Sequence, residues 1–476
     1  MAASDNHHPA PNGRKRPRKL TQALYEPSLA DLEGFDLTED GIARAFTKRH
    51  AETLLFDHEA GSWYWWDGAV WRRDRTKLAF SWARKLCRDF GTLGGNKAAL
   101  GKAATAAAVE RFAQTDQSFR ILAEEWDPDH WLLGTPNGTV DLRTGEVRPA
   151  RQKDRITKAT AVAPAEVPEC RLWLRFLDEI TNNDRDLIRF LRQWCGYCLT
   201  GSTREQALLF GAGPGGNGKG VFLGAIAGVL GDYAVNAAMD TFHASQHDRH
   251  STDLAMLAGA RMVMASETEQ GRAWAEARIK SITGGDKITA RFMRQDNFQF
   301  QPQFKLTIIG NHKPVLKNVD EAARRRFNIV PFDYKPPQKD PDLPEKLRRE
   351  WPEILRWMIE GCLDWQMNGL ARPKVVAEAT KEYFEAQDHF GRWLAECCVL
   401  LPTASTKPAK LLHSFQQWCQ ANGEESADNK RLRGMLERTE GLRYVTIKGS
   451  QLVRGIGLKP PGDLNARVEG GGLVDG

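Results

Sequence analysis

The sequence lacks any long apolar run. No stretch of 18 consecutive apolar residues occurs, and the N-terminus has no apolar signal-peptide core. These absences exclude an ordinary membrane-spanning helix and a secretory leader. We therefore expect a cytoplasmic protein without a membrane partner.

Cysteine is also sparse. Eight cysteines in 476 residues are too few for a disulfide-stabilised secreted scaffold. Cys195 and Cys198 form a C-x-x-C, but they lie in an apolar helical pattern and no second C-x-x-C accompanies them. We interpret them as core residues of a helix, with a metal or redox site as the alternative. Cys397 and Cys398 are interpreted as packing residues.

The charge of the chain is only mildly unbalanced. Lysine and arginine total 67 against 61 acidic residues, a net charge of +6. This bias is compatible with a polyanionic partner but does not identify one. A basic cluster at 14–19 lies in a polar segment, residues 1–36, that we expect to be a disordered arm. The arm either contacts DNA or serves as a solubilising tail.

An α+β domain is predicted at residues 37–172. A helix at 41–50 precedes a hairpin with a D-G turn that carries Trp63, Trp65, Trp66 and Trp71. These tryptophans either stack on bases or build the domain core, and we favour the core. An Ala-rich helical region at 80–125 and a turn-rich hairpin region at 127–148 follow. Amphipathic helices at 173–199 lead into the next motif.

A glycine-rich loop between a strand and a helix is the strongest motif. The apolar run 207–210 predicts a buried strand, and residues 221–230 predict a helix. The spacing G-x-x-x-x-G-K between them predicts a loop whose backbone N–H groups bind the phosphates of ATP, with Lys219 reaching the β- and γ-phosphates. The residues assigned to this loop are Gly213, Pro214, Gly215, Gly216, Asn217, Gly218, Lys219 and Gly220. Gly220 stands where a serine or threonine normally binds Mg²⁺.

A second strand supplies acidic groups. Residues 262–265 predict a core strand that ends in Ser266, Glu267 and, shortly after, Glu269. A phosphate loop needs such a group to hold Mg²⁺ or to polarise the attacking water. We assign Glu267 to the water and, with Ser266 or Glu269, to the metal.

A third strand and two basic segments complete the candidate site. The strand at 304–310 ends in Asn311, which either senses the γ-phosphate or closes a turn. Arg324, Arg325 and Arg326 either face solvent or supply an arginine finger to a neighbouring subunit. A hairpin at 289–304 is expected to present basic residues to a phosphodiester backbone, or only to solvent. The basic residues assigned to DNA binding are Lys280, Lys287, Arg291 and Arg294.

The order of these motifs resembles superfamily 3 helicases of the phage/plasmid primase and poxvirus primase–helicase group. The resemblance is carried by G-P-G-G-N-G-K, M-V-M-A-S-E-T-E, K-S-I-T-G-G-D-K-I-T-A-R-F-M-R-Q, G-N-H-K-P and D-E-A-A-R-R-R-F, and covers about residues 37–400. It implies an α/β fold, namely an AAA+-like P-loop NTPase core of three α/β/α layers. It also implies a homo-oligomeric ring, a hexamer, with ATP between subunits, that moves on single-stranded DNA and unwinds forked duplex.

The resemblance also predicts the domain plan. We expect the ATPase core with its preceding helices at 173–335, a helical lid at 336–400, a winged helix at 401–457 and a flexible tail at 458–476. Too few residues precede the recognisable part for a primase domain, so we expect no primer synthesis by this chain and a separate primase or origin-binding partner. The alternatives are a DNA-binding initiation ring that does not hydrolyse ATP, and an ATPase that does not act on DNA.

Overall fold

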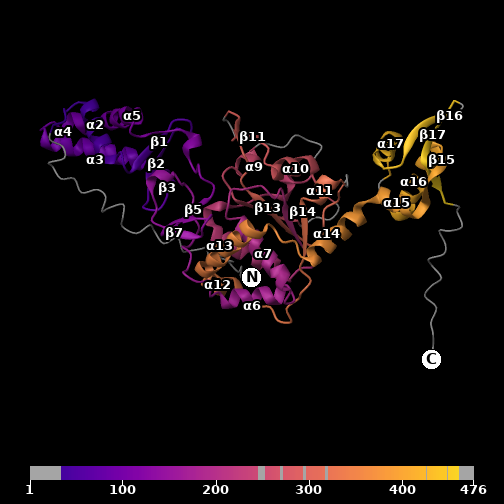
Figure 1. Ribbon diagram of the computed structural model, residues 1–476. Coiled ribbons are helices and arrows are strands. Elements are labelled where there is room, and N and C mark those ends of the chain that lie inside the picture. The colour runs from indigo at the N-terminus through magenta and orange to yellow at the C-terminus, as the bar shows by residue number, and fades with distance from the viewer. Residues whose placement is uncertain are drawn as a thin grey trace, which may run out of the picture.

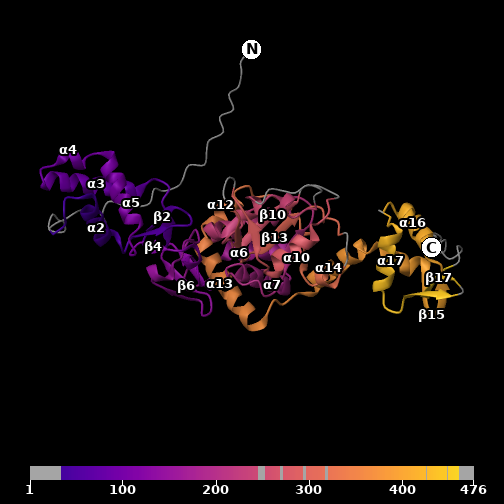
Figure 2. The same ribbon diagram turned by 90° about the horizontal axis from the view of Figure 1, so that it is seen from above.

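The protein consists of units arranged in a row (Figures 1 and 2). The computed structural model describes residues 34–244, 252–267, 272–292, 296–316, 320–424, 426–447 and 449–459. A mixed α/β N-terminal unit lies at one end, a parallel sheet with helices on both faces lies in the centre, and a smaller unit of helices and strands lies at the other end. Within these residues, no helix combines the length and the apolar character needed to cross a membrane.

The N-terminal unit packs helices against one face of a sheet with the order β3-β2-β1-β4. The predicted tryptophan hairpin is present as β2 paired antiparallel with β3. Trp63 and Trp71 are 5% and 1% exposed, whereas Trp65 and Trp66 are half-buried, so the hairpin mainly builds the core of this unit. Its elements are α2 (Glu39–His50), β1 (Leu54–Asp57), β2 (Ser62–Trp66), β3 (Trp71–Arg73), α3 (Leu78–Leu93), α4 (Lys97–Leu100), α5 (Ala103–Gln114), β4 (Arg120–Ile121) and η2 (Ala123–Glu125).

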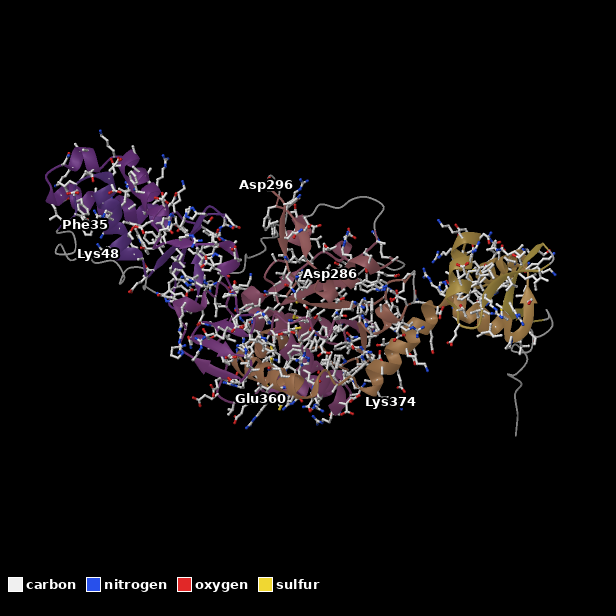
Figure 3. All side chains as sticks on the ribbon, turned by 45° about the horizontal axis from the view of Figure 1, so that its top comes forward. Phe35, Lys48, Asp286, Asp296, Glu360 and Lys374 are labelled. Atoms are coloured by element: carbon white, nitrogen blue, oxygen red, sulfur yellow. The ribbon has the colours of Figure 1, made fainter. Side chains whose placement is uncertain are left out.

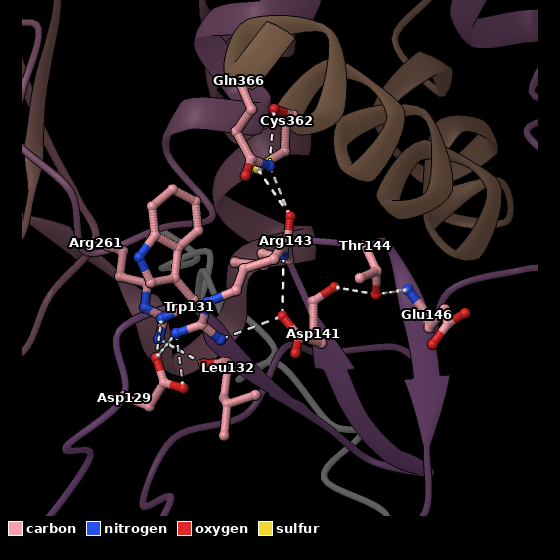
Figure 4. Close-up of polar contacts among 11 residues, drawn as sticks. Asp129, Trp131, Leu132, Asp141, Arg143, Thr144, Glu146, Arg261, Cys362 and Gln366 are labelled. Carbon is pink, nitrogen blue, oxygen red and sulfur yellow. Dashed lines mark hydrogen bonds and ion pairs between the residues drawn. The ribbon is translucent and has the colours of Figure 1, made fainter.

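A three-stranded meander joins this unit to the centre. It consists of β5 (Leu132–Thr135), β6 (Gly138–Asp141) and β7 (Glu146–Arg148), followed by η3 (Gln152–Asp154). Arg143 donates to both carboxylate oxygens of Asp129, at 2.9 and 3.0 Å (Figure 4). Two residues of the centre donate hydrogen bonds of 2.7 Å to carbonyl oxygens of the meander: Arg261 to Leu132 and Gln366 to Leu142. Side chains of the centre therefore fix the meander in place.

The central sheet has the order β14-β8-β13-β10-β9, and every pairing is parallel. Successive side chains along a strand point into two different cores. In β8, Leu209 packs with the helices preceding the strand, while Leu208 and Phe210 pack on the opposite face of the sheet. Both faces are thus covered, as parallel sheets require. The strands are β8 (Leu208–Ala212), β9 (Ala234–Asn236), β10 (Met262–Glu267), β13 (Lys305–Gly310) and β14 (Phe327–Pro331).

The helices of the centre come from segments far apart in the chain. Those named around the sheet are α6 (Arg171–Ile180), α7 (Arg185–Tyr197), α8 (Lys219–Leu230), η4 (Gly231–Tyr233), η5 (Met239–Thr241), α9 (Thr252–Ala255), α10 (Glu276–Gly284), α11 (Glu321–Arg324), α12 (Leu343–Arg348), α13 (Trp351–Asn368) and α14 (Lys374–Gln387). Gly196 on α7 meets Gly361 and Cys362 on α13 so closely that a Cβ on Gly196 would lie 2.1 Å from the Cys362 nitrogen. Cys195 and Cys198 are buried in this helix pair, which confirms their predicted place in a core helix.

A short hairpin rises from the central unit. It pairs β11 (Ile288–Ala290) with β12 (Phe298–Phe300), shorter than the hairpin predicted at 289–304. Asp296, between the two strands, marks its outer end in Figure 3. Phe292 is 40% exposed and stacks on Phe298, with ring centroids 5.6 Å apart.

Helix α14 leads from the centre to the C-terminal unit (Figure 1). That unit contains α15 (His389–Cys397), β15 (Cys398–Thr406), α16 (Pro408–Asn422), α17 (Asn429–Arg438), β16 (Arg443–Ile447) and β17 (Ser450–Leu458). Its sheet has the order β15-β17-β16, and its core runs from Trp393 to Ile456. β16 and β17 pair antiparallel, from Arg443 with Arg454 to Ile447 with Ser450. The predicted boundary at residue 401 falls inside β15, because Trp393 and Cys398 belong to the same core as the residues after it.

Candidate nucleotide site

The glycine-rich loop joins β8 to α8 at the carboxyl edge of the sheet. Gly216 and Gly218 have backbone φ angles of 81° and 86°, which residues other than glycine rarely adopt. A Cβ on Gly218 would also lie 2.6 Å from Cγ2 of Ile180. The glycines therefore give the loop its path, and α8 begins at Lys219, directly behind it.

Lys219 is folded onto its own loop. Its ammonium donates to the carbonyl oxygens of Gly213 and Pro214, at 2.6 and 2.9 Å, and to Oδ1 of Asn217 at 3.0 Å. Lys219 is 6% exposed, and burial lowers its pKa. A phosphate that binds here must exchange its oxygens for these loop oxygens around the ammonium.

The two strands that flank β8, namely β13 and β14, end beside this lysine and its loop. Oδ1 of Asn311, just after β13, lies 3.5 Å from Nζ of Lys219. Asn217 is 2% exposed and donates from Nδ2 to the carbonyl of Phe332, just after β14. The structure thus brings the predicted sensor amide to the predicted phosphate-binding lysine.

An open pocket of about 640 Å³ lies over the loop and the first turns of α8. Asn311 and Ile309 border it on the side of β13, and Pro344 and Trp351 border it on the side of α12 and α13. The loop and α8 supply Gly215, Gly216, Asn217, Gly218, Lys219, Gly220, Val221, Gly224 and Ala225. This volume suits a small-molecule ligand.

Glu267, the last residue of β10, is 4% exposed. Its Oε2 lies 2.5 Å from Nε2 of His243, which is itself 3% exposed. His243 reaches this place because its backbone forms a bridge with Trp274. The predicted water-activating carboxylate is therefore held against a buried histidine.

The structure places fewer of the predicted metal ligands near the pocket than the sequence suggests. Ser266 is exposed and pairs in register with Ile309, a pocket residue, whereas Glu269 lies outside the described residues. At Gly220 nothing lies within 4 Å of the position of a Cβ, so there is room for water in place of the absent hydroxyl. No group of three His, Cys, Asp or Glu suited to a metal occurs in the part of the chain that the structure describes. These residues fit an Mg²⁺ ion held mainly by phosphate oxygens and waters.

The three consecutive arginines have different surroundings. Arg326 is 7% exposed and donates to Oγ1 of Thr283 and to the carbonyl of Ala322, at 3.2 and 2.7 Å. Nη2 of Arg324 lies 3.8 Å from a carboxylate oxygen of Asp388. Arg325 is exposed. Arg326 is therefore a structural residue of the central unit, and Arg325 is the most exposed of the three.

The basic residues assigned to DNA binding do not all lie on the hairpin. Lys287 precedes β11 and Arg291 follows it, and both are exposed. Lys280 lies on α10 and forms an ion pair with Asp320, the N-cap residue of α11. Arg294 lies outside the described residues. Lys280 thus has a partner within the central unit.

Two further residues at the site were not found by sequence reasoning. His243 belongs to no recognisable motif, and only the fold brings it to Glu267. Lys339 lies between β14 and α12, and its Nζ would be 3.2 Å from a Cβ on Gly216. A second ammonium therefore lies beside the glycine-rich loop.

Two family models match this chain. The model described as "D5 N terminal like" matches residues 43–182, and a "Family of unknown function (DUF5906)" matches residues 212–326. Among solved structures, the apo C-terminal region of NrS-1 aligns over 90% of this chain and 100% of its own, with a TM-score of 0.49 and 11% identity.

Viral proteins are similar over most of the chain. A "Putative helicase" of Acanthamoeba polyphaga mimivirus is 26% identical over 326 residues, which is 62% of this chain and 34% of the viral protein. A "Putative helicase" of Frog virus 3 is 26% identical over 64% of this chain and 32% of its own length. A "Putative primase" of African swine fever virus is 22% identical over 64% of this chain and 34% of its own. The chain spans about a third of the length of these relatives. The two domain matches and the viral relatives together support a relationship of this chain to the D5-like primase–helicases.

Proposed function

We propose that this chain is the subunit of an ATP-dependent DNA helicase of superfamily 3, an AAA+-like P-loop ATPase of phage or mobile-element replication that acts in the cytoplasm. The observation that carries the proposal is the meeting of Lys219 and Asn311 at the carboxyl edge of a parallel sheet, where such sheets bind ligands. The names of the viral relatives support a role in DNA replication.

In this proposal ATP is the substrate and the loop binds its phosphates. Backbone N–H groups of residues 213–220 surround the β-phosphate at the N-terminus of α8, and Lys219 leaves its loop oxygens for the β- and γ-phosphates. Glu267 accepts the proton of the attacking water, and Asn311 donates to the γ-phosphate or to that water. Mg²⁺, when bound, would neutralise the charge that develops on the phosphates, and Ser266 would be a protein ligand to it, because Ser266 pairs in register with the pocket residue Ile309.

A neighbouring subunit completes the site. Arg325 is exposed, so we assign it as the arginine finger that reaches the γ-phosphate of an adjacent subunit in a hexamer. The hairpin of β11 and β12 supports contact with single-stranded DNA, because Lys287 and Arg291 flank its first strand. The C-terminal unit, with the helix and strand order of a winged helix, is a second candidate for contact with DNA.

A strand-displacement assay on a tailed duplex tests the proposal. The wild-type chain is expected to unwind the fork with ATP and Mg²⁺, while Lys219→Ala and Arg325→Ala do not. Lys339→Gln serves as a further variant, because it removes one ammonium beside the loop and should weaken nucleotide binding less than Lys219→Ala. A wild-type ATPase rate equal to that of Lys219→Ala, with or without single-stranded DNA, would instead favour a DNA-binding ring that does not hydrolyse ATP.

A further inference from the structure

The pocket extends well beyond the phosphate loop. Its far part is bordered by Val221, Gly224 and Ala225 of α8 and by Pro344 and Trp351. None of these side chains carries a charge. In our proposal the phosphates of ATP bind at the end of the pocket formed by the loop. The apolar end can therefore hold a different part of the nucleotide.

A stripe of glycines runs along α8. Gly220, Gly224 and Gly228 follow one another at four-residue intervals, which places them on the same side of the helix. Nothing lies within 4 Å of the Cβ position at Gly220 or at Gly224. At Gly228 a Cβ would be 2.3 Å from Cζ2 of Trp351. The bare backbone of α8 thus forms the floor of a trough that starts at the phosphate loop and ends at an indole ring.

The indole of Trp351 is held in place by its neighbours. Trp351 is the first residue of α13, and its six-membered ring rests on Gly228. The guanidinium of Arg348 lies 5.3 Å from the centre of the ring. Because these contacts fix the ring while it still borders the pocket, little side-chain entropy is lost when a flat ligand stacks on it.

We propose that this trough binds the nucleoside part of the triphosphate, with the sugar over Gly220 and Gly224 and the base against Trp351 and Pro344. The proposal rests on the proposed function, because the phosphates must occupy the loop for the base to reach the ring. It also gives Gly220 a role: a glycine there keeps the floor of the trough bare at the point where the sugar would cross.

Calorimetric titration of the full chain with ATP and with inorganic tripolyphosphate tests this proposal. Tripolyphosphate has the charges of the nucleotide but no base. Trp351→Ala is expected to weaken ATP binding about tenfold, in line with the loss of one base-stacking contact. Gly224→Leu, which fills the trough, is expected to weaken it at least as much. Neither variant should change the affinity for tripolyphosphate, and Trp351→Phe should restore most of the ATP affinity.

Controls separate this proposal from the one on which it rests. Gly434 on α17 is also a helical glycine with nothing within 4 Å of its Cβ position, so Gly434→Leu should leave both affinities unchanged. Unchanged ATP binding in both trough variants, or equal weakening of both ligands, would overturn the trough and leave the phosphate loop standing. A wild-type chain that binds tripolyphosphate as tightly as ATP would do the same. Failure of the wild-type chain to bind either ligand would overturn both proposals.

Discussion

Nε2 of His243 lies 2.5 Å from Oε2 of Glu267, and both side chains are buried. In our proposal Glu267 must face the attacking water, yet it does not line the pocket that Lys219 and Asn311 border. We infer that this close contact with His243 holds Glu267 in a resting position, away from the pocket.

We predict that His243→Ala raises the ATPase rate measured without DNA. Removing a restraint of about 1.4 kcal/mol corresponds to a roughly tenfold faster rate. His243→Gln keeps a hydrogen-bond donor and is expected to stay near the wild-type rate. A lower rate in His243→Ala, with an unchanged melting temperature, would mean that His243 positions Glu267 for the reaction instead of restraining it.

Arg325 and Arg326 should respond differently to alanine substitution. Arg325→Ala is expected to lower kcat roughly a thousandfold, the effect of losing an arginine finger, without changing the melting temperature. Arg326→Ala is expected to lower the melting temperature, because the hydrogen bonds to Thr283 and Ala322 are lost. Activity regained on mixing Arg325→Ala with Lys219→Ala subunits would place Arg325 in the site of a neighbour. Mixed subunits that remain inactive would contradict this.

Gly220→Ser should lower the Mg²⁺ concentration that gives half-maximal turnover. The serine fits, because nothing lies within 4 Å of the Cβ position, and its hydroxyl adds the ligand that this loop lacks. Gly220→Ala is the matched control, since it adds the Cβ without the oxygen. Equal Mg²⁺ dependence in the serine variant and the wild type would mean that water and Ser266 already complete the metal site.

The crossing of α7 and α13 should tolerate no Cβ. In Gly361→Ala the new methyl would lie 2.1 Å from the carbonyl oxygen of Arg192, and we expect a loss of about 2 kcal/mol or more in the free energy of unfolding. Gly434→Ala, in open space on α17, is expected to be neutral or to stabilise by up to about 1 kcal/mol. Thermal unfolding measures both, and equal melting temperatures would contradict the close contact.

Lys305 gives the fold a pH dependence. It is 1% exposed and donates to backbone carbonyls that include those of Thr200 and Gln303, and burial lowers its pKa from 10.5 to about 7. The unfolded chain therefore binds more protons between these two values, and the free energy of unfolding rises with pH across that window, by at most about 1.4 kcal/mol per pH unit.

Urea titrations at several pH values within that window measure this slope. We expect Lys305→Met to remove it, although the variant is less stable overall because the carbonyls lose their donor. Lys381→Met is the control, since the Lys381 side chain is 70% exposed. A slope that survives in Lys305→Met would assign the pH dependence to other groups.

Sequence reasoning found the parts of the site that depend on local chain geometry. Short motifs beside apolar runs predict the loop at 213–220, the strand that ends at Glu267 and the position of Asn311. The structure has a strand at each of the three apolar runs. The tryptophan hairpin and the buried Cys195 and Cys198 are likewise local patterns.

The parts that it missed depend on contacts between distant segments. His243 meets Glu267 through a bridge to Trp274, and Trp351 meets α8 because Gly228 leaves room for its ring. Lys280 looked like part of the basic hairpin, but α10 turns it toward Asp320. Pairings of this kind leave no periodic signal in one sequence, so only the folded chain reveals them.

Helix α14 connects the nucleotide edge of the sheet to the C-terminal unit. Its Tyr383 donates to the carbonyl of Pro314 at 2.5 Å, and its Gln387 accepts from the backbone nitrogen of Leu316 at 3.1 Å. Both partners lie in the segment that continues from Asn311, whose amide touches Lys219. In our proposal, a change in the phosphates that moves Asn311 therefore acts on the end of α14 that leads directly into the C-terminal unit. The segment after Asn311 thus connects the nucleotide pocket to the C-terminal unit through two hydrogen bonds, so occupancy of the one is expected to influence the position of the other.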